Sequence, residues 1–248
     1  MTRLIPFAFL FGTLLAAPAL AQSDAPVDSL DHEFFFTRGI YGDGGDGEWG
    51  PRWAVDYPRA DRHFLVALRR LTVVDAYESD FTVALDDPQL RDYPFVYILE
   101  VGSLGLDSEQ ARKLREYLLA GGFLVIDDFW GSWAWRNLEE QMRQVFPDRP
   151  IVEVSLDHPV FHAFYDIDEV LQVPNVHQAA GGPTYEYDGY VPHVRGIFDD
   201  KGRLMVLINW NTDLGDAWEW ADRPSYPLRY STYAYELGIN FVIYAMSY

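Results

Sequence analysis

Residues 121–129 read Gly-Gly-Phe-Leu-Val-Ile-Asp-Asp-Phe, an apolar run that ends in two adjacent carboxylates, Asp127 and Asp128. The run follows a segment with helical spacing, so we expect a helix, a tight glycine turn and then a buried strand. In parallel sheets, ligands usually bind at the carboxyl ends of the strands. The two aspartates therefore mark where a site is expected, without indicating what it does.

Strands and helices are predicted to alternate on both sides of this run. Asp107-Ser-Glu-Gln110 is a capping box, and the helix that it opens is expected to end at Gly121-Gly122. The other predicted helices cover residues 56–71, 133–146 and 233–246, and the predicted strands cover 34–38, 73–74, 95–99, 123–127 and 151–154. This order predicts an α/β fold with a mostly parallel, doubly wound sheet.

The C-terminal part departs from this alternation. Asp199-Asp-Lys-Gly202 separates two apolar runs, 194–198 and 203–208, as in a β-hairpin. We therefore expect the sheet to be followed by a C-terminal hairpin and a final buried helix.

The first 21 residues have the features of a secretory signal peptide. Arg3 provides a positive start, residues 4–15 are apolar, and Ala19-Leu-Ala21 is a small-residue cleavage site. About 12 apolar residues are too few to span a bilayer, which needs roughly 20. We expect cleavage after Ala21, a tail over 22–33, a single domain over 34–248, no transmembrane segment after cleavage, and a periplasmic or secreted location.

The composition predicts an acidic protein with a large core. Hydrophobic residues make up 49% of the chain and aromatic residues 16%. The formal charge of −19 becomes −20 when Arg3 leaves with the signal peptide, since 18 basic residues then face 38 acidic ones. Such a charge repels phosphate groups, which argues against nucleic acids and anionic lipids as partners. The chain has no cysteine, which excludes disulfides, thiolate metal ligands, a lipoprotein anchor and a cysteine nucleophile.

Polar side chains follow four of the predicted strands. They are Arg38, Glu100, Asp127 with Asp128, and Asp157 with His158. Because the carboxyl ends of parallel strands meet at one edge, we expect these groups to share a cleft, with Trp130 lining it. Each aspartate alone is also explained as a turn or cap residue.

Two kinds of hydrolysis are compatible with these residues. No serine-hydrolase elbow is present, but Asp127 or Asp128 as nucleophile with His158 as base is chemically sound. Adjacent residues on a strand point to opposite faces, so an acid and base for glycoside hydrolysis would instead pair Asp127 with Glu100 or Asp157.

No cofactor is predicted, although a divalent cation remains a hypothesis. Asp43, Asp46 and Glu48 lie in the glycine-rich loop 39–50, whose oxygens suit a hard cation such as calcium. Two glycines occupy positions at which an EF-hand has ligands, so a flexible acidic loop is the preferred interpretation. The histidines show no H-E-x-x-H or comparable zinc spacing.

Four motifs together carry a resemblance to a known family. They are Trp53-Ala-Val-Asp-Tyr-Pro-Arg-Ala-Asp61, Gly121-Gly-Phe-Leu-Val-Ile-Asp-Asp128, Asp157-His-Pro-Val-Phe-His-Ala-Phe-Tyr165 and Asn211-Thr-Asp-Leu-Gly-Asp-Ala-Trp218. In this order, and over about residues 34–244, the chain resembles the bacterial domain-of-unknown-function family 4159. The resemblance implies a class I glutamine amidotransferase-like fold, which is a flavodoxin-like three-layer α/β sandwich, and no agreed activity. Its motif positions imply the candidates Asp56, Asp61, Asp127, Asp128, His158, Asp213 and Trp218.

Three hypotheses for the function follow. The missing cysteine puts glutaminase chemistry out of reach, which favours an exported, non-catalytic module that binds a small molecule or glycan, or assists assembly of the cell envelope. The alternative is a hydrolase, with carbohydrate as one candidate substrate, that uses Asp127 and His158 with Arg38 holding an anionic or polar group. A third hypothesis is a structural partner of a cell-envelope protein complex, in which the edge residues form only salt links.

Overall fold

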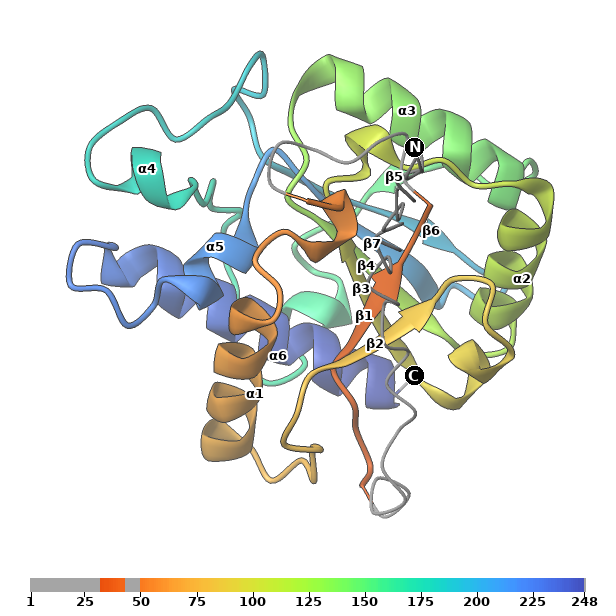
Figure 1. The fold of residues 1–248 in the computed structure, drawn as a ribbon, viewed down its shortest axis with the longest axis horizontal. Coiled ribbons are helices and arrows are strands. Elements are labelled where there is room, and N and C mark those ends of the chain that lie inside the picture. The colour runs from red at the N-terminus through yellow and green to blue at the C-terminus, as the bar shows by residue number, and fades with distance from the viewer. Residues whose placement is uncertain (1–31, 43–49, 248) are drawn as a thin grey trace, which may run out of the picture.

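The computed structural model describes residues 32–42 and 50–247 (Figure 1). The expected signal peptide and most of the expected tail lie outside the described residues, as do the candidate cation ligands Asp43, Asp46 and Glu48. None of the helices in these two ranges is long and apolar enough to cross a membrane.

A seven-stranded sheet runs through the described residues, in the order β2-β1-β3-β4-β7-β6-β5. The strands are β1 (Thr37–Ile40), β2 (Phe81–Ala84), β3 (Phe95–Leu99), β4 (Phe123–Asp127), β5 (Val152–Glu153), β6 (His193–Phe198) and β7 (Leu204–Trp210). Strands β1, β2, β3, β4 and β7 are mutually parallel, while β6 runs antiparallel to both β7 and β5. The predicted α/β class, the mostly parallel sheet and the hairpin are therefore confirmed.

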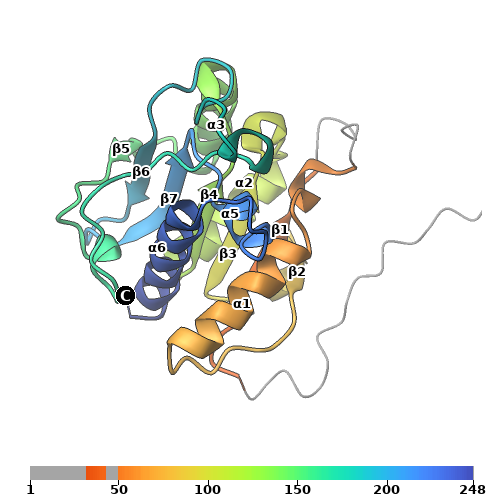
Figure 2. The same ribbon diagram turned by 90° about the vertical axis from the view of Figure 1, so that its left-hand side faces the viewer.

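Helices cover both faces of this sheet. They are α1 (Arg59–Leu71), α2 (Ser108–Leu119), α3 (Gly131–Val145), α4 (Val176–Ala179), α5 (Leu214–Glu219) and α6 (Leu228–Ser247). The two views show α1, α5 and α6 on one face and α2 and α3 on the other (Figures 1 and 2). The arrangement is consistent with a three-layer α/β fold.

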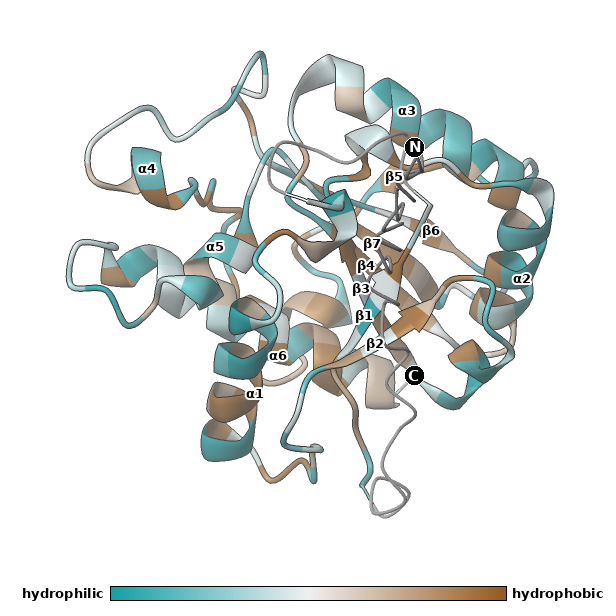
Figure 3. Cartoon of the chain, viewed as in Figure 1, coloured by the Kyte–Doolittle hydropathy of each residue, from teal (hydrophilic) through white to brown (hydrophobic). Residues whose placement is uncertain are grey.

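The central strands are apolar on both sides because both of their faces are covered. On β3, Tyr97 and Leu99 belong to the core under α1 and α6, whereas Val96 and Ile98 belong to the core under α2 and α3. The residues of β4 alternate in the same way. Figure 3 shows hydrophobic strands at the centre and hydrophilic outer faces on α2 and α3.

The turn that delivers β4 to the sheet has the predicted chemistry. The Asp107 side chain accepts from the N–H groups of Glu109 and Gln110, and Gln110 Oε1 accepts from Asp107 N at 3.1 Å, so α2 begins with a capping box. At its end, Gly121 has a φ of 123°, in the region that favours glycine. A Cβ on Gly122 would lie 2.3 Å from the Tyr117 ring, so a larger residue does not fit there.

Two predicted strands differ from the structure. The expected strand 73–74 is wrong, because Val73 is fully exposed and the second strand is β2, at the edge of the sheet. Residues 34–36 precede β1, and Phe34 forms only an isolated bridge with Ala76. Short apolar pairs and edge strands carry little periodic signal, which explains the first error. The second arises because Phe34 and Phe36 are buried in the core without belonging to β1.

A buried ion pair fixes α1 against the sheet. Arg38 on β1 and Asp61 on α1 are both fully buried. Arg38 donates two hydrogen bonds to the Asp61 carboxylate, and its Nη1 donates to Val55 O at 3.3 Å. The guanidinium also lies over the Tyr97 ring, 4.8 Å from the centroid. The pair therefore occupies the position that the sequence assigned to a ligand-binding arginine.

We predict that Arg38→Met lowers the free energy of unfolding by about 3–5 kcal/mol, because Asp61 is left as a buried charge without a partner. Urea unfolding measures this value. In the matched control Arg69→Gln, which breaks an exposed pair with Glu78, the change should stay below about 1 kcal/mol. Equal effects of the two substitutions would contradict this role of the buried pair.

Candidate functional site

Six carboxylates gather beyond the carboxyl ends of β4 and β7. They are Asp56, Asp127, Asp128, Asp213, Asp216 and Glu219, and we call them the carboxylate cluster. Asp127 is the last residue of β4, and Asp213 caps α5 just after β7. Asp56 comes from the segment before α1, so distant parts of the chain meet at this edge.

Asp127 accepts more hydrogen bonds from described residues than any other member of the cluster. Its side chain is fully buried, and its Oδ2 accepts from Tyr97 Oη at 2.6 Å, Leu214 N at 2.9 Å and Gly215 N at 3.2 Å. No described donor reaches its buried Oδ1. Burial raises the pKa of Asp127 to about 6, although the three donors act in the opposite direction.

Asp128 and Asp213 are buried beside it. Asp128 Oδ1 accepts from Trp130 Nε1 at 3.0 Å, and Asp213 Oδ1 accepts from Asp216 N at 2.7 Å. Burial raises the pKa of both carboxyl groups well above its usual value, and the charges of neighbouring carboxylates raise it further. Each of the two therefore keeps one oxygen to which no described residue donates.

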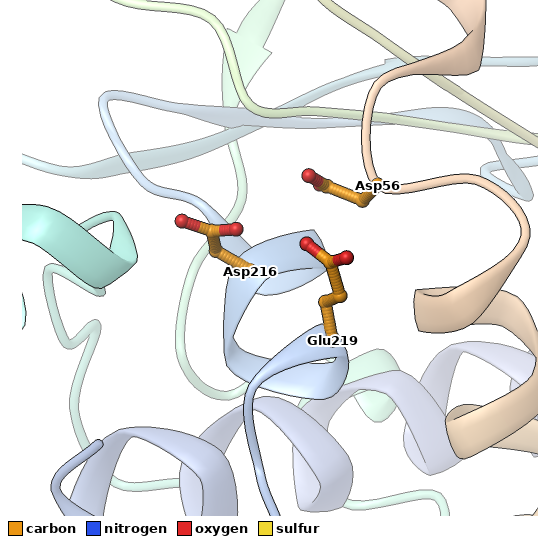
Figure 4. A group of neighbouring side chains, drawn as sticks. All are labelled: Asp56, Asp216 and Glu219. Carbon is orange, nitrogen blue, oxygen red and sulfur yellow. The ribbon is translucent and has the colours of Figure 1, made fainter. Parts of the chain in front are cut away.

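Asp56, Asp216 and Glu219 form the other side of the cluster, with their carboxylates turned toward a common space (Figure 4). Asp56 Oδ2 is buried without a hydrogen-bond partner among the described residues. This oxygen is so near Gly215 that a Cβ there would lie 2.4 Å from it. Asp216 accepts from Val176 N at 2.6 Å and Trp220 Nε1 at 2.8 Å, and burial raises the pKa of Glu219 to about 7.

Among the described residues, cations act on the cluster only without direct ion pairs, as Arg59 and Arg223 do when they lower the pKa of Glu219. None of its six members forms a salt bridge there. Arg38 is near enough to lower the pKa of Asp56, but it is bound to Asp61. Burial is the main reason that the pKa values of all six are raised, and neighbouring carboxylates raise those of Asp56, Asp128, Asp213 and Glu219 further.

A pocket of about 400 Å³ lies next to the cluster. Its lining residues are Arg52, Glu100, Gly102, Ser103, Phe129, Trp130, Trp133, Ala134, Glu186, Tyr187 and Asp188. It meets the cluster at Asp128, whose carboxylate accepts from Trp130 and whose backbone oxygen accepts from Glu100 N at 3.0 Å. Inside the pocket, Arg52 Nη1 lies 3.3 Å from Glu100 Oε1.

The pocket combines rigid walls with exposed aromatic rings. The first N–H groups of α3, at Gly131 and Ser132, donate to Asn211 Oδ1 and Asp188 Oδ1, each at 2.9 Å. Trp133, in the first turn of α3, is 67% exposed, and Tyr187 is 81% exposed. Large aromatic side chains normally contribute to burial, so two exposed rings on one pocket make it a candidate binding surface.

Backbone conformations in the left-handed region concentrate at this edge. Among the described residues other than glycine, a positive φ occurs at Asp56, Glu100, Asp128, Tyr187 and Asn211. All five belong to the cluster or the pocket, or support α3 beside them. Such conformations cost free energy and collect at functional sites, where the surrounding structure maintains them.

The structure brings together some of the candidate residues and separates others. Asp56, Asp127, Asp128 and Asp213 share the cluster, and Glu100 and Trp130 line the pocket. Asp61 is paired with Arg38, and Trp218 is a core residue that packs against Phe64.

Asp157 and His158 do not join the cleft in which they were expected. His158 packs against Phe198 and Tyr244. Tyr244 Oη accepts from Leu204 N, so this histidine lies near the start of β7. Asp127 lies beside the other end of β7, where the strand finishes. His158 instead caps a short turn by accepting from Val160 N, and Asp157 is exposed. After β5 the chain turns back along the sheet. The carboxyl end of β5 therefore does not place Asp157 and His158 beside Asp127, as its direction had predicted.

Sequence reasoning missed four residues of the edge. Tyr97 and Asn209 are polar residues that interrupt apolar strands. A polar side chain at a buried strand position was the only indication in the sequence that either belongs to the site. Asp216 lies inside a quoted motif and Glu219 just after it, one helical turn apart, but α5 was not predicted.

A family model described as "Domain of unknown function (DUF4159)" matches residues 40–246. The chain belongs to this family, so the resemblance carried by the four motifs is confirmed. No curated protein matches the chain.

The raised pKa of Asp127 predicts a pH-dependent effect of Asp127→Asn on stability. The pKa of Asp127 is about 6 in the folded protein, whereas its ordinary value, expected in the unfolded chain, is 3.8. Between these two pH values the folded state binds more protons than the unfolded state. The free energy of unfolding therefore falls as the pH rises through this range. The variant cannot ionise. It should match the wild type near pH 3, below both pKa values, and exceed its Tm by roughly 5–10 °C at pH 7.5.

Differential scanning calorimetry in EDTA measures both melting temperatures. Surface carboxylates with lowered pKa values, such as Asp148, make the protein more stable as the pH rises, which opposes the effect of Asp127. They are the same in both proteins, so the difference in Tm between wild type and variant reports Asp127 alone. The control Asp92→Asn changes an exposed aspartate and should show no such dependence. A difference in Tm that shrinks toward neutral pH would contradict the prediction.

Proposed function

We propose that this DUF4159 protein is an exported, non-catalytic module that binds a glycan in the pocket beside the carboxylate cluster, on an amidotransferase-like scaffold. The observation that carries the proposal is the pair of exposed rings, Trp133 and Tyr187, on a concave surface rich in carboxylates. Sugars offer apolar C–H faces that stack on such rings and hydroxyl rims that donate to carboxylates.

The charge of the pocket supports a neutral or amine-bearing sugar. Its three carboxylates are those of Glu100, Glu186 and Asp188, and its single cation among the described residues is Arg52, which faces Glu100. The net charge of −19 adds long-range repulsion of anionic glycans.

Two features favour binding over catalysis. The chain contains no cysteine, so the amidotransferase nucleophile is missing. The hydrolase hypothesis needs His158 next to Asp127, and these residues lie at opposite ends of β7. The histidine that this hypothesis uses as general base is therefore not beside Asp127.

The structural-partner hypothesis has less support. It requires the edge residues to be used in salt links, and Arg38 and Glu100 do form them, with Asp61 and Arg52. In the described part of the chain, however, the six cluster carboxylates form no salt bridge. The leader-like sequence over residues 1–21 supports export, and glycans of the cell envelope are then the accessible partners.

We predict that Trp133→Ala weakens glycan binding at least tenfold, because the ring supplies the stacking surface. Isothermal titration calorimetry with neutral and amine-bearing oligosaccharides, including peptidoglycan fragments, measures the affinity. The matched control is Phe164→Ala, which removes an exposed aromatic ring outside the pocket and should leave the affinity unchanged.

A second variant separates the two sugar classes. Glu100→Gln removes a pocket carboxylate and should weaken binding of amine-bearing sugars while sparing neutral ones. The proposal fails if no oligosaccharide binds at millimolar concentration, or if Trp133→Ala and Phe164→Ala bind equally well.

A further inference from the structure

We propose that Asp56, Asp128 and Asp213 bind one hard divalent cation, Ca²⁺ or Mg²⁺, at the carboxyl edge of the sheet. Each of the three offers one carboxylate oxygen, and these oxygens all lie within 4.8 Å of one another. Calcium–oxygen bonds measure roughly 2.3–2.6 Å, so oxygens on opposite sides of one ion lie about 5 Å apart. The three oxygens therefore fit around a single ion.

Oxygen atoms that lack partners provide an observation independent of the clustering. Asp127 is fully buried, yet its Oδ1 accepts no hydrogen bond from a described residue, and neither does the buried Oδ2 of Asp56. A buried carboxylate oxygen without a donor is costly unless a cation satisfies it.

A buried amide points to the same place. Asn209 is fully buried, and no described partner reaches either its Oδ1 or its Nδ2. It follows Ile208, which is paired with Ile126, so it occupies the position on β7 next to Asp127. Amide oxygens are common ligands of hard cations. Four of the six buried side-chain atoms without a described partner thus belong to Asp56, Asp127 and Asn209, while Arg149 and Trp218 hold the other two.

Hydrogen bonds orient two of the proposed ligands, Asp128 and Asp213, and their neighbour Asp127 without an ion. Tyr97, Leu214 and Gly215 hold Oδ2 of Asp127, while Trp130 holds one oxygen of Asp128. Asp213 is held by the N–H of Asp216. Because these bonds occupy only one oxygen of each carboxylate, the other is left for a ligand.

The chemistry of the ligands selects the cation. All the oxygens come from carboxylates, with no histidine in the group and no cysteine in the chain. Zinc and copper prefer imidazole or thiolate, whereas Ca²⁺ and Mg²⁺ prefer oxygen. A divalent ion would also supply the positive charge that the cluster lacks.

A second group, Asp56 with Asp216 and Glu219, is a poorer site (Figure 4). Both oxygens of Asp216 already accept hydrogen bonds, from Val176 N and Trp220 Nε1. Glu219 already has cationic neighbours, since Arg59 and Arg223 lower its pKa. We therefore assign the ion to the group that contains Asp128 and Asp213, independently of whether the pocket binds a glycan.

Titration calorimetry of the purified, EDTA-treated protein with CaCl₂, and separately with MgCl₂, in NaCl of physiological strength tests the site. We expect one ion per chain, and a rise in Tm of about 5–10 °C at a hundredfold excess over Kd. The two titrations identify which ion is preferred, and binding of either at this stoichiometry supports the site.

Variants locate the bound ion. Asp128→Asn and Asp213→Asn should each weaken the affinity at least tenfold. Both should remain folded, with a Tm in EDTA equal to or above that of the wild type, because each removes a repelling charge. The matched control Glu219→Gln alters only the second group and should leave the affinity within about twofold.

Two results would overturn the proposal. One is the failure of both ions to bind with a stoichiometry of one. The other is loss of binding in Glu219→Gln with retention in Asp128→Asn, which would place the ion in the second group.

Discussion

The crowding of carboxylates at one edge of the sheet is the constraint on which the other features of this protein depend. Six acidic groups meet beyond β4 and β7, and no described cation forms a salt bridge with them. Because such an arrangement opposes folding, the rest of the structure must stabilise it. The hydrogen bonds to Asp127, the left-handed backbone at Asp128 and the cap at Asp213 all maintain it.

Two interactions hold the edge together. The buried pair of Arg38 and Asp61 joins β1 to α1 and thereby places Asp56, which lies just before that helix. The Asp127 carboxylate joins β3, β4 and α5 through Tyr97 and the first N–H groups of α5. These two interactions fix the positions of the strands and helices around the edge. The pocket and the cluster meet there at Asp128, so a ligand in the pocket would lie close to a cation in the cluster.

Sequence patterns predicted the fold well where periodicity or turn chemistry was strong. The capping box of α2, the glycine turn and the apolar strand β4 gave the centre of the sheet and placed Asp127 and Asp128 at its edge. Edge strands such as β2 were missed, since a four-residue strand has little pattern. The site was predicted only in part, because a strand direction does not show where the following loop goes, as His158 illustrates. Contacts such as Arg38 with Asp61 depend on tertiary packing, which spacing alone does not encode.

The most direct test of this account is a crystal structure of the protein grown with calcium or magnesium. We predict one peak of electron density bonded to oxygens of Asp56, Asp128 and Asp213, at roughly 2.3–2.6 Å for calcium or about 2.1 Å for magnesium. The contradictory result is a cluster without such a peak, in which these carboxylates share protons or bind only water.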